Sequence, residues 1–168
     1  RFKKVIREQL DNPWEWVRYG QREIKNTQLR YHGGLTGGFI LSPLCIPRLL
    51  LKLVIGYGIN MTRLSDPWND YDELKGEVEE LRGMGMTSVV NLIYSISPRH
   101  TDEYYARKAR EAAAMRPYRL CFKDVAGMLT PDRAYSLAKL ILENVGDVPV
   151  EFHSHCNNGL APYNVLEV

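Results

Sequence analysis

The residues best suited to chemistry lie at the ends of two predicted strands in the second half of the chain. Residues 148–155 alternate apolar and polar side chains, so His153 and His155 share one face of a strand. Residues 120–123 predict an earlier strand, in which Lys123 shares the polar face with Cys121. Because ligands bind at the carboxyl ends of parallel strands, we predict a site formed by Lys123, His153 and His155.

A helix is predicted between these two strands. Thr130 is the expected N-cap, Pro131 suits the first helical position, and Gly146 is a stop signal. Between these ends, apolar residues recur at helical spacing: Ala134, Leu137, Ala138, Ile141 and Val145. One face of this helix is therefore expected to be buried.

Two segments around the predicted site resemble a known pair of signatures. CFKDVAGMLTP (121–131) and VEFHSHCNNGLAP (150–162) are similar to those of the metal-dependent pyruvate carboxyltransferase family, which includes the carboxyltransferase parts of pyruvate carboxylase, transcarboxylase and oxaloacetate decarboxylase. Both segments occur in the family's order and at about its separation. In that family a carbamylated lysine and two histidines bind a divalent metal. The resemblance implies that Lys123, His153 and His155 are metal ligands, with Lys123 also catalytic.

The resemblance implies a metal-dependent reaction on a keto acid. A neutral lysine amine can capture CO2 and become an anionic carbamate, an oxygen donor that suits zinc, manganese or cobalt together with two imidazoles. The metal would stabilise an enolate as pyruvate gains, or oxaloacetate loses, a carboxyl group. Biotin on a separate carrier domain or subunit is the implied partner, and a homo-oligomer is expected for the full-length protein.

Other interpretations stay open. Two histidines on a strand are more often packed or solvent-facing than metal-bound. A second enzyme class, the Claisen-type lyases and synthases such as HMG-CoA lyase and isopropylmalate synthase, shares the HxH pattern but lacks the lysine ligand. A noncatalytic barrel fragment is the third hypothesis. Cys121 and Cys156 are interpreted as small buried side chains rather than ligands.

Arg30 is the candidate for binding the substrate carboxylate. Residues 28–32 predict a strand with Leu29 and Tyr31 on one face and Arg30 and His32 on the other. The resemblance places a carboxylate-binding arginine at about this strand, although LRYHGGLTGG departs from the family's LLRG context. A structural ion pair is the alternative role for Arg30, and His32 is a second candidate.

The spacing of the predicted elements indicates an α/β barrel. Strands near residues 28, 61, 88, 119 and 149 are each followed by a helix, which favours a parallel sheet with outer helices. By resemblance these are about strands three to seven of a TIM (β/α)8 barrel. We expect a single incomplete domain over residues 1–168, truncated at both ends and lacking the family's aspartate ligand and proton-relaying threonine. Such a fragment is expected to be inactive alone.

Composition excludes several function classes. A net charge of +2 with no recognisable nucleic-acid motif argues against nucleic-acid binding. The long apolar run from residue 37 to 58 is interrupted by prolines and basic residues, so no membrane span is expected. The glycine-rich loop of Gly33, Gly34, Gly37 and Gly38 matches no phosphate-binding motif. Three cysteines without a paired spacing favour a reducing compartment, and we expect a cytoplasmic protein. The acidic EVEE segment (77–80) is interpreted as a solvated helix face.

Overall fold

Strands and helices alternate along most of the chain. The computed structural model describes residues 2–36 and 43–168, so Gly37 and Gly38 of the glycine-rich loop lie outside the described residues. The strands are β1 (Tyr31–His32), β2 (Met61–Leu64), β3 (Thr87–Ile93), β4 (Arg119–Asp124) and β5 (Val150–Ser154). The helices are α1 (Phe2–Glu8), α2 (Pro13–Glu23), α3 (Cys45–Gly56), α4 (Tyr71–Gly83), α5 (Asp102–Ala114), α6 (Pro131–Leu142) and α7 (Ala161–Glu167).

The five strands form one parallel sheet in the order β1-β2-β3-β4-β5. Each strand is joined to the next by a helix, as in the βα units of a (β/α)8 barrel. The predicted fold class, a partial TIM barrel, is confirmed. The first strand is shorter than predicted, because only Tyr31 and His32 of residues 28–32 enter the ladder.

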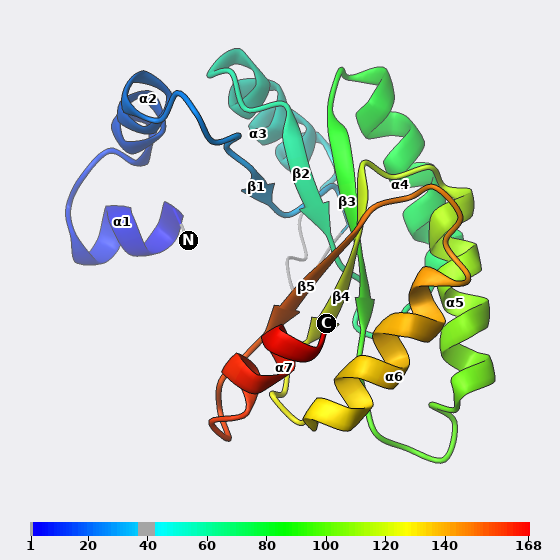
Figure 1. Ribbon diagram of the computed structural model, residues 1–168. Helices are drawn as coiled ribbons and strands as arrows, with labels where there is room; N and C mark the ends of the chain where they lie inside the picture. Colours follow the sequence, from blue (N-terminus) through cyan, green and yellow to red (C-terminus); the bar gives the residue numbers. More distant parts are fainter. Residues whose placement is uncertain (1, 37–42) are drawn as a thin grey trace.

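The main hydrophobic core lies between the sheet and helices α3 to α6, which line one face of the sheet (Figure 1). From the strands it receives side chains such as Val90, Leu120 and Phe122. From the helices it receives Leu51, Leu74, Tyr105 and Leu137, among others. The opposite face of the sheet carries a small apolar cluster of Met61, Val89 and Cys121. This second face is the inner face of the barrel arc, and it carries the predicted site.

Helices α2, α4 and α5 begin at residues whose side chains cap them, whereas the predicted cap of α6 makes no such bond. Asn12 and Thr101 cap α2 and α5 by accepting from the amides of Trp14 and Tyr104. Asp70 accepts from the amide of the second residue of α4. Thr130 occupies the N-cap position of α6, but its side chain makes no capping hydrogen bond.

Two expectations about burial are wrong. Glu77, in the EVEE segment, is buried against the loop after β1, where its carboxylate accepts from the amide of Leu35 and the hydroxyl of Thr36. The loop descends onto α4 there, which a helical pattern alone does not reveal. Cys156 is exposed, because the chain leaves the sheet before it, whereas Cys121 is buried as expected.

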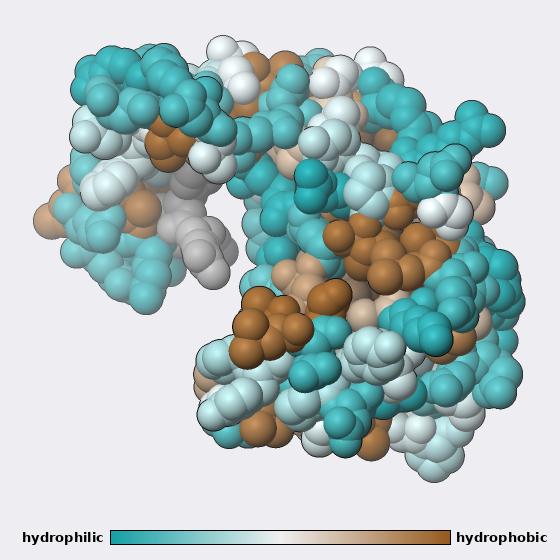
Figure 2. All heavy atoms as spheres, in the orientation of Figure 1, coloured by the Kyte–Doolittle hydropathy of each residue, from teal (hydrophilic) through white to brown (hydrophobic). Residues whose placement is uncertain are grey.

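Apolar surface remains exposed at the C-terminal side of the sheet. Figure 2 shows it near α6 and α7, and exposed side chains there include Leu142, Val165 and Leu166. Within the described ranges, none of the helices has the length and apolar character needed to cross a membrane.

Candidate metal and carboxylate site

Lys123 and His153 occupy paired positions on neighbouring strands. They are register partners in the ladder between β4 and β5, so both side chains leave the sheet on its inner face. The position lies at the carboxyl ends of both strands, where the sequence places the site. Lys123 is 8% exposed, so its amine is largely removed from water, while His153 is half-buried. The predicted proximity of these two residues is confirmed.

His155 follows the end of β5 and remains close to His153. The two imidazole ring centroids are 5.2 Å apart in an edge-on arrangement. The amide of His155 donates a 3.0 Å hydrogen bond to the carbonyl oxygen of Asp124, which keeps the chain beside β4 after the strand ends. Within the described part of the chain, no three His, Cys, Asp or Glu side chains gather as a metal site. The predicted set is of another kind, because one of its three members is a lysine.

Burial and nearby positive charge lower the pKa of both Lys123 and His153, so they favour the unprotonated form of each. Burial lowers the pKa of His153 to about 4, with further lowering by the charges of Arg63 and Lys123. Burial also lowers the pKa of Lys123, and Arg63 adds to that effect. His153 is therefore a neutral nitrogen donor at pH 7. A larger fraction of the Lys123 amine is therefore in the neutral form, which reacts with CO2, than for an exposed lysine.

Arg30 forms an ion pair on the inner face. Its guanidinium lies 2.7 Å from the carboxylate of Glu151, and the two side chains are 29% and 21% exposed. The pair joins the segment leading into β1 to β5, the opposite edge of the sheet. Arg30 therefore forms a structural ion pair, which is the alternative role that the sequence analysis left open for it.

Known proteins resemble this chain in sequence and in fold. It is 32% identical over 169 residues to a pyruvate carboxylase subunit of Methanocaldococcus jannaschii, a match that covers 99% of this chain and 30% of that protein. It is 24% identical over 170 residues to the methylmalonyl-CoA carboxyltransferase 5S subunit of Propionibacterium freudenreichii subsp. shermanii, covering 99% of this chain and 34% of that subunit. No family model matches the chain.

The solved carboxyl transferase domain of Rhizobium etli pyruvate carboxylase has the same arrangement of elements. It superposes with a TM-score of 0.89 at 22% identity over 99% of this chain and 29% of that one. The chain resembles the pyruvate carboxyltransferase family in sequence and in fold. It spans about 30% of the length of the Methanocaldococcus subunit, so it corresponds to part of that protein.

In this chain Asp124 fixes the loop beside the site. Its buried carboxylate accepts hydrogen bonds from the amides of Met128 and Leu129, at 3.0 and 3.1 Å, and from the hydroxyl of Ser154, at 2.9 Å. One side chain thereby ties the loop after β4 to the end of β5. Sequence reasoning missed this role, although the KD pair of the signature was a signal for it.

The KDVAG signature of the pyruvate carboxyltransferase family also contains a glycine with a structural role. Gly127 has φ +67°, and a Cβ there would overlap the backbone carbonyl oxygen of His155. Nearby, the side chain of Asn157 donates to the carbonyl of Ala126 at 3.2 Å. The loop after β4 and the turn after β5 are therefore packed directly against each other.

Arg63 is a further inner-face residue that the sequence interpretation overlooked. It is the register partner of His32 on β1 and of Val89 on β3, and Val89 belongs to the inner apolar cluster. Its position in the strand predicted near residue 61 was the available signal. The next row of the inner face contains Asn91, Cys121 and Glu151, and burial raises the pKa of the Cys121 thiol to about 11.

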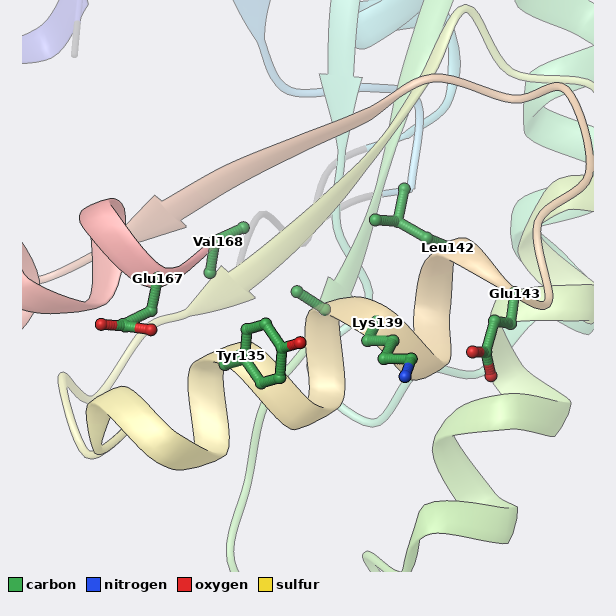
Figure 3. A pocket seen from close by; sticks show the side chains of 7 residues that line it. Tyr135, Lys139, Leu142, Glu143, Glu167 and Val168 are labelled. Atoms are coloured by element: carbon green, nitrogen blue, oxygen red, sulfur yellow. The ribbon is translucent and has the colours of Figure 1, made fainter.

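A separate hollow of about 410 Å³ lies between α6 and the end of α7 (Figure 3). Its lining includes Tyr135, Leu142 and Val168, and it contains none of the predicted site residues. It is on the helical side of the sheet, so it is unrelated to the chemistry proposed for the inner face.

Proposed function

We propose that this chain forms the metal-binding part of a biotin-dependent carboxyltransferase or decarboxylase that acts on pyruvate or oxaloacetate. The observation that carries the proposal is the in-register pair of Lys123 and His153, with the ring of His155 beside that of His153. The family relationship supports it, because the relatives include pyruvate carboxylase and methylmalonyl-CoA carboxyltransferase subunits.

Lys123, as a carbamate, would hold a divalent metal together with His153 and His155. The donor set fits zinc, manganese or cobalt, which accept imidazole nitrogen and anionic oxygen. Two features of the chain support this fit: the neutral imidazole of His153 and the lowered pKa of the buried Lys123 amine. The metal would supply a Lewis acid that polarises the keto oxygen and favours the enolate form of the substrate.

The protein's own contribution is to prepare and hold these donors. The ladder between β4 and β5 fixes Lys123 beside His153. Asp124 holds the adjoining loop in place, which orients the start of the turn at His155. Burial of the Lys123 amine favours its neutral form, the form that reacts with CO2.

The partners follow from the proposed reaction. Biotin on a carrier domain or subunit would deliver or remove the carboxyl group, and the keto acid would be the second substrate. A homo-oligomer remains an expectation for the complete protein. The cysteines Cys45, Cys121 and Cys156 are all free, which supports a reducing compartment such as the cytoplasm.

Metal analysis tests the proposal. The purified complete protein should contain about one divalent metal ion per chain by elemental mass spectrometry, and Lys123→Ala, His153→Ala and His155→Ala should each lose most of it. Incubation with ¹³CO2 should give a carbamate carbon signal that Lys123→Ala abolishes. Lys139→Ala, on the helical side of the sheet, is the control and should keep both metal and signal.

Activity measurements on the complete protein distinguish the alternative functions. Biotin-dependent decarboxylation of oxaloacetate that disappears in Lys123→Ala supports the carboxyltransferase. Acetyl-CoA-dependent condensation or cleavage that is unaffected by Lys123→Ala would favour the Claisen-type group instead. A protein without metal, or one that keeps its metal after both histidines are replaced, would support a noncatalytic barrel element.

A further inference from the structure

Arg63 lies on the inner face of the sheet, two rows before the predicted site. The row consists of His32, Arg63, Val89 and Arg119, which are register partners along β1 to β4. Two residues further along β4 and β5, on the same face, are Cys121 and Glu151, and beyond them the pair of Lys123 and His153. A long side chain at position 63 therefore shares its face with the candidate metal ligands.

The guanidinium of Arg63 has no charge partner in the part of the chain that the structure describes. No carboxylate there lies within ion-pairing distance of it, and its buried Nε atom has no hydrogen-bond partner. Arg30 is the contrast, because Glu151 already neutralises it at 2.7 Å. An unpaired arginine that is half-buried is costly, since a desolvated charge is normally compensated by an anion.

The surroundings of Arg63 are positive rather than negative. Burial lowers the pKa of both Lys123 and His153, and the positive charge of Arg63 lowers both further. The carboxylate that faces this region, that of Glu151, is held by Arg30. The inner face near Arg63 therefore has an excess of positive charge, which favours a small anionic ligand.

We propose that Arg63, rather than Arg30, binds the carboxylate of the α-keto acid. The inference rests on the proposed function for the substrate class, but not on the presence of a metal. A guanidinium offers two parallel N–H donors that match a carboxylate, and the bound anion would satisfy the Arg63 Nε atom. Arg30 could bind the same carboxylate only by giving up its ion pair with Glu151.

Binding of pyruvate and methyl pyruvate to the purified complete protein tests this assignment. Isothermal titration calorimetry or ligand-observed NMR gives Kd for both, with metal present and in EDTA. Methyl pyruvate keeps the keto group but has no carboxylate, so wild type should bind pyruvate more tightly. Arg63→Gln should weaken pyruvate binding by about tenfold or more and leave methyl pyruvate binding unchanged. Arg63→Lys, which keeps the charge but loses the paired donors, should be intermediate.

Arg119→Gln is the matched control, because Arg119 lies in the same row of the inner face but at the amino end of β4. It should bind pyruvate within about twofold of wild type, well inside the change expected for Arg63. Circular dichroism and metal content of each variant show whether the fold and the ligands are kept. If Arg63→Gln does not fold, Arg63→Lys and the preference of wild type for pyruvate over methyl pyruvate decide the matter.

Several results would overturn the assignment. They are unchanged pyruvate binding in Arg63→Gln, a tenfold loss in Arg30→Gln with none in Arg63→Gln, or equal binding of pyruvate and methyl pyruvate by wild type. Failure of the metal proposal has a different signature: no metal is found, yet pyruvate binding in EDTA still depends on Arg63. That outcome would support Arg63 as the carboxylate ligand and reject the metal-dependent reaction.

Discussion

Gly127 is packed against the backbone of His155, so closely that a Cβ on Gly127 would overlap the carbonyl oxygen of that histidine. The contact joins the signature around Lys123 to the signature around the two histidines. The glycine of one motif therefore determines where the other motif can run.

Gly127→Ala is expected to displace His155 and to reduce metal binding. The variant adds the strain of a left-handed residue, about 1–3 kcal/mol, and also forces the backbone after β5 away. Metal content and thermal unfolding measure the two effects. Gly146→Ala is the control, since Gly146 has φ +60° but open space around its Cβ position, so it should lose stability and keep its metal. Equal metal occupancy in both variants would argue against the positioning role of Gly127.

Sequence patterns predicted the pairing of Lys123 with His153 because two rules determine it. The period of two in a strand sets the face of each side chain, and the parallel arrangement sets the end of the sheet at which they meet. The same rules placed Arg30 on the inner face. They could not give its partner, because the approach of Arg30 to Glu151 depends on the curvature of five strands. The burial of Glu77 likewise depends on a loop from another unit.

Asp124→Asn should lower the free energy of unfolding by more than the loss of one hydrogen bond would. The carboxylate accepts from two loop amides and from Ser154, and an amide side chain replaces one acceptor by a donor. We expect a loss of about 1–3 kcal/mol in chemical unfolding, because a buried donor is left unsatisfied. Ser154→Ala should cost less. Asp132→Asn, in the exposed first turn of α6, is the control, and an effect as large there would contradict the interpretation.

The metal-free protein should lose stability between about pH 6.5 and pH 4. His153 has a native pKa of about 4, below its ordinary value of 6.5, so the unfolded chain binds the proton first as the pH falls. The stabilisation is complete above pH 6.5 and is lost as the pH decreases through the native pKa. Denaturant midpoints at pH 8 and pH 5 in EDTA measure it. His153→Gln should flatten this dependence, whereas His100→Gln, in the loop before α5, should leave it intact.

The ion pair between Arg30 and Glu151 should show a measurable coupling energy. A double-mutant cycle with Arg30→Gln and Glu151→Gln is expected to give about 1 kcal/mol, because both side chains are less than one third exposed. The pair of Arg48 and Glu80, between α3 and α4, has a similar N–O distance but is 46% and 37% exposed, and it should give less. A larger coupling energy for Arg48 and Glu80 than for Arg30 and Glu151 would show that burial does not determine the coupling energy.

Arg30 and Glu151 are 121 positions apart, whereas each strand of the sheet is bonded to the strand next to it in the sequence. The ladders can therefore form one after another as the polypeptide leaves the ribosome, each on the strand made before it. The contact of Arg30 with Glu151 has to wait for the fifth strand. It marks the completion of this five-stranded arc, and fraying of either edge strand would break it while the central ladders persist.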